Sequence, residues 1–204
     1  MIGIINYGSG NVQAIANIYN RTNFSYKIVE KPDQLKFVDK LILPGVGDFD
    51  ETIKVLDSSG LRNALKEEVT IKKKPVLGIC VGMQILSDES EEGNQKGLGW
   101  IKGNVKKFDI QKIKEKPHVP HMGWNNVEPK IGHDLFKNID IELGFYFVHS
   151  YYFKTFNSNN ILATTFYGEE FTSAVFNENI FGVQFHPEKS HSNGIQLLTN
   201  FARL

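Results

Sequence analysis

The segment that decides the fold is Val76-Leu77-Gly78-Ile79-Cys80-Val81-Gly82-Met83-Gln84, in which a short apolar run leads into the only cysteine of the chain. The run predicts a buried strand, and the residues after Gly82 predict a helix, so Cys80 stands at a strand-to-helix corner. Such a corner needs small neighbours, and Gly78 and Gly82 supply them. A lone cysteine is more often a small buried core residue. In this glycine frame we instead interpret Cys80 as a nucleophile whose thiolate is favoured by the dipole of the following helix.

The composition excludes several classes of protein. The 204 residues carry 23 Lys plus Arg and 23 Asp plus Glu, so the global charge gives no reason to expect nucleic acid or an anionic membrane as a partner. A single cysteine excludes an intrachain disulfide framework and fits a reducing compartment. No apolar run approaches the length of a membrane span, and the first residues resemble a strand more than a signal peptide. We therefore expect a cytoplasmic protein with no membrane partner.

Strand-like and helix-like segments alternate along the first half of the chain. Residues 12–19 and 50–73 carry apolar side chains at helical spacing. Short apolar runs that predict strands stand around them, at residues 2–5, 26–29 and 41–43. This alternation predicts a parallel sheet with helices on both faces.

The later half is richer in strand-like segments. The aromatic run 145–153 predicts one long core strand, and weaker strand signals occur near residues 105–108 and 125–127. Further strands are predicted at 161–166, 172–176 and 180–185, followed by a last helix. No linker or repeat divides the chain. We expect a single domain over residues 1–204, an α/β three-layer sandwich with a mostly parallel central sheet and an antiparallel portion in the later half.

Two further residues complete a candidate catalytic site with Cys80. His186 follows the predicted strand 180–185, and Glu188 lies two positions on, so both face the same side of an extended segment. A carboxylate beside an imidazole fixes its tautomer and stabilises its protonated form, as in Cys/His/acid triads. Acyl transfer to sulfur also needs backbone N–H donors for the oxyanion. The N–H of Val81 and one in the glycine loop ending at Gly47 are the natural candidates.

The sequence predicts no cofactor and no metal. The Gly8-Ser9-Gly10 turn has Gln13 where a dinucleotide-binding fingerprint needs its third glycine, and no lysine follows the loop at Gly47 in the Walker pattern. His118 and His121 are three residues apart, but no third metal ligand accompanies them, and the flanking prolines predict an extended loop.

Six motifs are spread along the whole chain. They are Asn6-Tyr7-Gly8-Ser9-Gly10-Asn11, Pro44-Gly45-Val46-Gly47, Gly78-Ile79-Cys80-Val81-Gly82-Met83-Gln84, Pro120-His121-Met122-Gly123-Trp124-Asn125, Tyr146-Phe147-Val148-His149-Ser150-Tyr151 and Gln184-Phe185-His186-Pro187-Glu188-Lys189-Ser190. With these motifs the chain resembles the class I (triad) glutamine amidotransferases. Within that family it most resembles the glutaminase subunits of imidazole glycerol phosphate synthases, and the fourth and fifth motifs narrow the resemblance to these subunits.

The resemblance implies a glutaminase mechanism with a glutamyl thioester on Cys80, His186 and Glu188 as its partners, and an oxyanion hole at Gly47 and Val81. It also implies glutamine contacts from Gln84, Glu92, Ser150 and Tyr151. From the sequence alone, Glu92 could equally be an ordinary surface charge within an acidic stretch.

The family further implies a heterodimer. The ammonia passes through a tunnel to a (β/α)8 cyclase subunit that makes imidazole glycerol phosphate and AICAR in histidine biosynthesis, and glutamine hydrolysis is weak until that partner is bound. Residues 121–125 and the glycine loop are expected near the partner.

Two departures from the family pattern leave other ammonia acceptors open. Asn6 replaces a usual aspartate, and Lys102 replaces a usual proline. A related branch supplies ammonia to sugar-amidating enzymes of surface polysaccharide synthesis. A thiol peptidase on the same architecture is a second alternative, against which Gln84 and the His149-Ser150-Tyr151 motif speak, and a non-catalytic subunit is a third.

Overall fold

Five neighbouring strands at one side of the central sheet are parallel, as the alternation of strand-like and helix-like segments predicted. The computed structural model describes residues 1–114, 118–130 and 132–204. The strands run in the order β2 (Tyr26–Val29), β1 (Ile2–Ile5), β3 (Lys40–Gly45), β4 (Val76–Cys80) and β13 (Ile180–Val183). β4 is therefore an interior strand, and both of its neighbours are parallel to it. The carboxyl ends of adjacent parallel strands form the usual ligand site of an open α/β sheet, and Cys80 ends β4.

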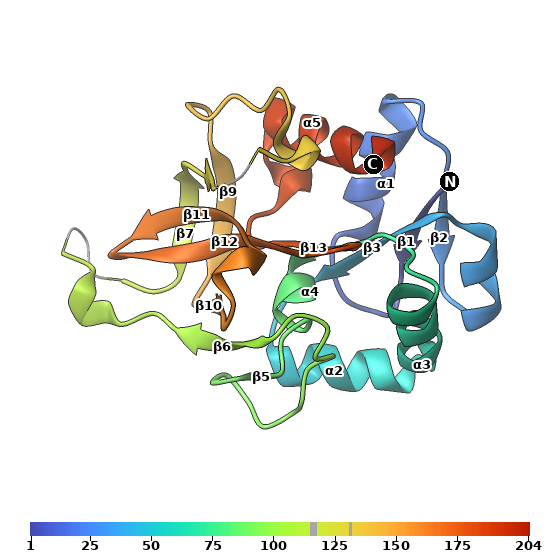
Figure 1. The fold of residues 1–204 in the computed structure, drawn as a ribbon, viewed down its shortest axis with the longest axis horizontal. Coiled ribbons are helices and arrows are strands. Elements are labelled where there is room, and N and C mark those ends of the chain that lie inside the picture. Colours follow the sequence, from blue (N-terminus) through green and yellow to red (C-terminus); the bar gives the residue numbers. More distant parts are fainter. Residues whose placement is uncertain (115–117, 131) are drawn as a thin grey trace.

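Helices cover both faces of this parallel portion (Figure 1). One face carries α1 (Val12–Arg21) and α5 (His191–Arg203), and the other carries α2 (Phe49–Ser58) and α3 (Leu61–Lys66). The apolar residues at helical spacing lie inside, since Ile53, Leu56, Leu61, Leu65 and Val69 are all buried. The predicted three-layer α/β sandwich is confirmed.

The sheet continues beyond β13 as an antiparallel portion, as predicted. Its strands are β12 (Glu169–Asn177), β10 (Tyr151–Thr155), β6 (Gly103–Lys107), β11 (Ile161–Tyr167) and β8 (Glu128–Pro129). The short strand β5 (Glu89–Ser90) follows β6 at the edge of the sheet and is parallel to it. A separate antiparallel pair is formed by β7 (His121–Asn125) and β9 (Phe145–His149). Short helical turns are η1 (Pro32–Phe37), η2 (Glu67–Ile71), η3 (Ile110–Lys112), η4 (Asp134–Phe136), η5 (Ser158–Asn160) and η6 (Pro187–Lys189).

Several sequence-based predictions about single elements are wrong. The aromatic run 145–153 is two strands, β9 and β10, which separate at Ser150 and enter different sheets. The predicted helix over 50–73 is broken near Gly60, whose φ of 72° ends α2 and begins α3. Backbone in this left-handed region cannot continue an α-helix.

The third error concerns the region of His121. His121 lies on β7 rather than in a loop, because this strand pairs with the aromatic strand β9. The strand predicted near 125–127 is correspondingly displaced, and β13 stops at Val183 instead of residue 185.

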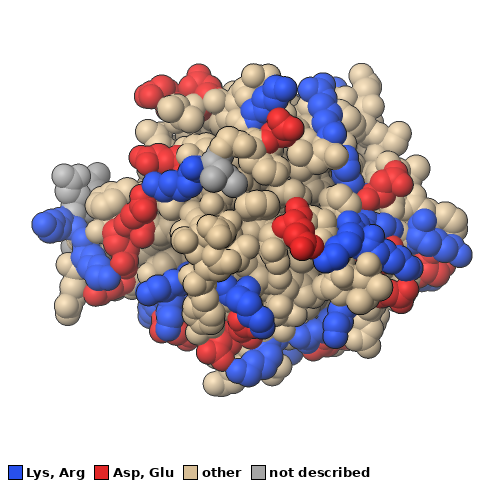
Figure 2. Space-filling model, in the orientation of Figure 1, with Lys and Arg blue, Asp and Glu red and all other residues tan. Residues whose placement is uncertain are grey.

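The face of the molecule seen in Figure 2 carries both signs of charge. On the face seen in Figure 2, lysines and arginines alternate with acidic residues. In the described ranges, no helix combines the length and apolar character that crossing a membrane requires.

Candidate active site

Cys80 occupies a strained corner between β4 and α4 (Val81–Gln84). Its backbone has φ 55° and ψ −115°, outside the regions that an L-residue adopts easily. The corner is the predicted one, but the helix after it, α4, is a single turn that ends at Gln84. A helix this short contributes a much smaller dipole than the sequence suggested.

Glycines allow this corner to pack directly on the neighbouring strand. A Cβ at position 82 would lie 1.9 Å from the backbone oxygen of Leu43, and one at position 78 would lie 2.5 Å from the oxygen of Gly82. A Cβ at position 45 would lie 2.4 Å from the nitrogen of Gly82. The predicted need for small residues is thus confirmed, and it extends to Gly45 at the end of the adjacent strand β3.

Replacing Gly82 with alanine is expected to lower the free energy of unfolding by about 2–4 kcal/mol, because the added methyl group meets backbone that has little freedom to move. Urea denaturation measures this. Gly132→Ala is the matched control, since a Cβ there meets nothing within 4 Å. Equal stability of the two variants would contradict the assigned packing.

The side chains of His186 and Glu188 make the predicted contact, but the backbone between them does not have the predicted extended conformation. Nδ1 of His186 lies 2.8 Å from Oε1 of Glu188, and both side chains are almost fully buried. Glu188 is not in an extended segment, because Pro187 begins the 3₁₀ turn η6 directly after His186. Oε1 of Glu188 also accepts a hydrogen bond of 2.7 Å from Nδ2 of Asn11. No role was predicted for Asn11, which is 177 residues from Glu188 along the chain.

The surroundings of His186 favour its protonated form. Burial lowers the pKa of His186, but hydrogen bonds and charge interactions with Cys80 and Glu188 outweigh it and raise the pKa to about 10. Since Nδ1 is engaged by Glu188, Nε2 is the nitrogen left for Cys80. The pKa of Glu188 is lowered; burial raises it, but the hydrogen bond from His186 prevails. His186 thus interacts with Glu188 on one side and with Cys80 on the other.

A pocket of about 390 Å³ opens over Cys80 and His186. Every residue that the sequence analysis placed in the site lines it except Glu188, which lies behind His186. Residues that were not predicted also line it, among them Pro120, Val148, His149 and Lys189. The structure therefore brings the predicted residues together, although they come from five separate parts of the chain.

Glu92 lies at the wall of the pocket and is not a free surface charge. Its Oε2 accepts a hydrogen bond of 2.9 Å from the N–H of Phe49, in the first turn of α2. Burial raises the pKa of Glu92, the Phe49 N–H opposes this, and the nearby charges of Asp48 and Asp50 raise it further. A cation placed here would relieve the repulsion among these carboxylates.

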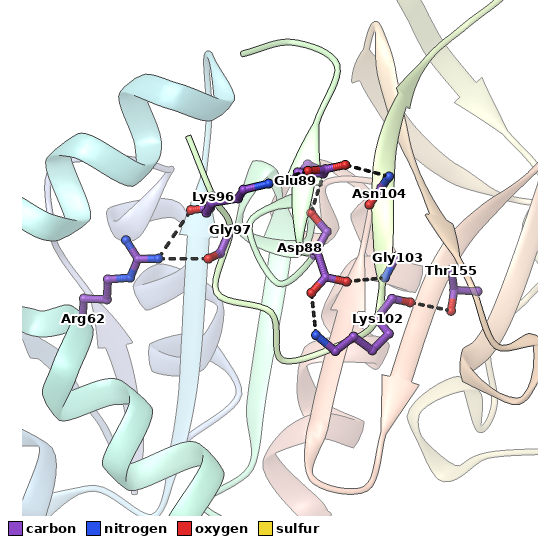
Figure 3. A network of polar contacts seen from close by, with 10 residues as sticks. Arg62, Asp88, Glu89, Lys96, Gly97, Lys102, Gly103, Asn104 and Thr155 are labelled. Carbon is purple, nitrogen blue, oxygen red and sulfur yellow. Dashed lines mark hydrogen bonds and ion pairs between the residues drawn. The ribbon is translucent and has the colours of Figure 1, made fainter. Parts of the chain in front are cut away.

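The segment that carries Glu92 is fixed from both sides. Asp50 accepts hydrogen bonds of 2.9 Å from the backbone of Asn94 and of Gln95. Figure 3 shows the outer contacts of the same segment, which include Arg62 donating to the carbonyl oxygens of Lys96 and Gly97. Other pairs in the same view join Lys102 and Gly103 to Asp88, and Lys96 and Asn104 to Glu89.

These contacts explain the two departures from the family pattern. Lys102 pairs with Asp88 at 2.7 Å, and Asn6 donates a hydrogen bond of 2.8 Å to Glu30. Neither residue lines the pocket. Both departures are therefore accommodated by local polar contacts outside the site.

The glycine loop at the pocket has a conformation that its sequence requires. Gly47 has φ 96°, which favours glycine, and it lines the pocket. The hydroxyl of Ser9 accepts a hydrogen bond of 3.0 Å from the N–H of Val46 and donates one of 3.1 Å to its carbonyl. The N-terminal turn thus holds the loop beside Cys80.

Gln84 and Gln184 form a polar floor beneath the nucleophile. Nε2 of Gln84 donates to the carbonyl of Tyr151 at 2.9 Å and to Oε1 of Gln184 at 3.0 Å. Nε2 of Gln184 lies 3.8 Å from Sγ of Cys80. The sequence analysis predicted Gln84 as a glutamine contact and gave Gln184 no role. The only signal for Gln184 in the sequence was its place two residues before His186.

Comparison with known proteins gives a consistent result over the full chain. The family model described as glutamine amidotransferase class-I matches residues 3–203. The imidazole glycerol phosphate synthase subunit HisH of Leptospira interrogans is 50% identical over 204 residues, with all of both chains covered. The subunits of the same name from Leptospira borgpetersenii and Bdellovibrio bacteriovorus are 48% and 47% identical, again over the full length of both chains.

Solved structures that are more distant in sequence share the fold. A glutamine amidotransferase crystal structure superposes with a TM-score of 0.73 at 18% identity, covering 100% of this chain and 99% of that one. A chain in the structure of PurLQS from Thermotoga maritima superposes with a TM-score of 0.75 at 17% identity, covering 99% and 96%. At these identities the likeness concerns the fold alone.

Proposed function

Because the chain belongs to the class I glutamine amidotransferase family, we propose that its pocket hydrolyses glutamine to glutamate and ammonia as the glutaminase subunit of an imidazole glycerol phosphate synthase. The observation that carries this proposal is the buried hydrogen-bonded pair of His186 and Glu188, with Cys80 and His186 in one pocket whose wall holds Glu92. The family assignment made from sequence motifs is confirmed by the full-length relatives.

The reaction follows from the geometry of the three groups. The thiolate of Cys80 attacks the side-chain carbonyl carbon of glutamine, and the oxygen of that carbonyl takes the negative charge. Protonated His186 gives its proton to the leaving nitrogen, which departs as ammonia and leaves a glutamyl thioester. His186 then takes a proton from water, which attacks the thioester and releases glutamate. Glu188 holds the imidazole and stabilises its charge throughout.

The pocket walls suit the two ends of glutamine. Glu92, with Asp48 and Asp50 near it, is the site for the α-ammonium group. Gln84, Ser150 and Tyr151 lie along the pocket as further contacts. The N–H groups of Gly47 and Val81 are the proposed oxyanion donors, because these residues flank Cys80 in the pocket lining.

The relatives favour histidine biosynthesis over other uses of the ammonia. The three full-length relatives are all named imidazole glycerol phosphate synthase subunits, and none is named for a sugar-amidating system or a peptidase. We accordingly propose a cyclase subunit as the partner and acceptor. Strand β7 offers a docking surface of suitable character, since Met122 and Trp124 are 58% and 48% exposed.

The test is glutamate release from glutamine by the purified chain, with and without the cyclase subunit and its nucleotide ligand. We expect strong stimulation by the complete mixture. Hydrolysis that the cyclase leaves unchanged would contradict the assignment to histidine biosynthesis while leaving the glutaminase assignment intact.

A further inference from the structure

A buried pair of histidines lies beside the pocket, and the mechanism above does not use it. His121 on β7 and His149 on β9 are directly opposite each other in the two-stranded sheet. Nδ1 of His121 lies 3.0 Å from Nε2 of His149, and the two residues are 3% and 6% exposed. His149 also lines the pocket. Buried polar groups that are fully paired, as these are, can fix one arrangement of the surrounding backbone.

The partners at the two ends fix where the protons lie. Nδ1 of His149 is 2.8 Å from the carbonyl oxygen of Tyr151, which can only accept, so this nitrogen carries a hydrogen. Its Nε2 must then accept, and Nδ1 of His121 must donate to it. Nε2 of His121 is left as an acceptor, and Nδ2 of Asn125 lies 3.1 Å from it.

The orientation of the Asn125 amide is itself determined. Its Nδ2 also donates to the carbonyl of Phe166 at 2.9 Å, and its Oδ1 accepts from the N–H of Asn126 at 2.8 Å. The hydrogen bonds therefore run in one direction, from Asn125 through His121 and His149 to Tyr151. Both rings are neutral in this arrangement.

The surroundings of the pair oppose any added proton. The His121 ring is stacked between Phe147 and Tyr167, with centroid distances of 4.7 Å and 4.1 Å. Burial lowers the pKa of His121 to about 4 and that of His149 to about 3. His118 and His186 contribute in the same direction, and an imidazolium here would also place two N–H donors against each other. The direction of the hydrogen bonds from Asn125 to Tyr151 is thus stable at neutral pH.

The carbonyl of Tyr151 connects the hydrogen bonds of the two histidines to the pocket around Cys80. It accepts from His149 and also from Gln84, which reaches Cys80 through Gln184. It lies one residue beyond Ser150, where β9 ends and β10 begins. This is the point at which the aromatic run changes sheet. The backbone of the pocket wall is therefore held where regular strand pairing stops.

We propose that His121 and His149 are positioning residues that hold the Ser150–Tyr151 wall of the glutamine pocket, in a hydrogen-bond direction set by Asn125 at one end and the Tyr151 carbonyl at the other. The proposal rests on the proposed glutaminase function for the identity of the ligand. The histidine pair acts on glutamine only through the backbone that it holds.

Asn125→Asp tests the proposal, with Asn125→Ala as its matched control. A carboxylate can only accept hydrogen bonds, so the aspartate variant requires a hydrogen on Nε2 of His121. The direction of every hydrogen bond in the series is then reversed, and Nδ1 of His149 presents a lone pair to the Tyr151 carbonyl. Alanine removes the same side-chain contacts, but the Tyr151 carbonyl still sets the original direction. We expect the KM for glutamine to rise about tenfold in the aspartate variant, with a smaller change in kcat, because roughly one hydrogen bond is lost at the pocket wall. The alanine variant should remain close to wild type.

Nitrogen-15 NMR of the imidazoles supplies a second readout that does not depend on turnover. The aspartate variant should show an exchange of protonated and unprotonated ring nitrogens in His121 and His149, and the alanine variant should not. Kinetics are measured in the presence of the cyclase subunit. An active Asn125→Asp variant with exchanged ring nitrogens and an unchanged KM would overturn this proposal alone. The absence of hydrolysis in the unmodified protein would overturn the proposed function as well.

Discussion

Replacing Cys80 with alanine is expected to lower the kcat for glutamine hydrolysis by roughly a thousandfold or more, because the thiolate that forms the thioester is removed. The fold should survive, since alanine has nearly the same size and the glycines around the corner are unchanged. The measurement is glutamate release with the cyclase subunit present. Isothermal titration with glutamine provides the control, as binding through Glu92 and the Ser150–Tyr151 wall does not need the sulfur.

A Cys80→Ala variant that keeps more than a few per cent of the original kcat would contradict the assigned nucleophile. Loss of both binding and folding would instead show that the cysteine has a packing role. The two results are separated by measuring thermal unfolding of the same preparation.

Replacing Glu188 with glutamine is expected to lower kcat about a hundredfold or more. The amide can still accept from Nδ1 of His186 and from Asn11, so the geometry is largely kept, but it cannot stabilise the imidazolium. The carboxylate is one of the groups that raise the pKa of His186 to about 10. Without it the pKa falls, and the alkaline limb of the pH–rate profile should move to lower pH.

The pH dependence of stability gives the same variant a second signature. A histidine whose pKa rises on folding contributes stability that is complete below its unfolded pKa of about 6.5 and is lost as the pH rises toward the folded value. Glu188→Gln should therefore be least stable, relative to the unmodified protein, near and below pH 6.5. The matched control is Glu178→Gln, because Glu178 forms an exposed pair with Lys73 on another surface. An unchanged pH–rate profile would contradict the role of Glu188.

The corner at Cys80 could be predicted because its cause is local. Two glycines around a cysteine after an apolar run leave few other conformations, and the clashes that a Cβ would make at positions 78 and 82 show why. The same holds for the parallel strands of the first half, where apolar runs alternate with helical spacing. Local sequence also contains the signal for the helix break, since Ser58, Ser59 and Gly60 interrupt the helix predicted over 50–73.

The break at Ser150 could not be read from the sequence, because its cause is tertiary. The run from Phe145 to Phe153 alternates like one strand, yet its first part pairs with β7 and its second part with β6 and β12. Asn11 and Gln184 escaped prediction for the same reason, as each contacts a residue more than 100 positions away. The contact between His186 and Glu188 was predicted correctly, but the predicted backbone conformation was wrong, because the turn η6 replaces the extended segment.

The most direct test of the account is mass analysis of the protein after brief exposure to glutamine and rapid acid quenching, in the presence of the cyclase subunit. The account predicts a mass increase of one glutamyl group on the peptide that contains Cys80, and none in Cys80→Ala. Ammonia release with no such adduct, or with the adduct on a different residue, would contradict the assignment of Cys80 as the nucleophile of a glutaminase.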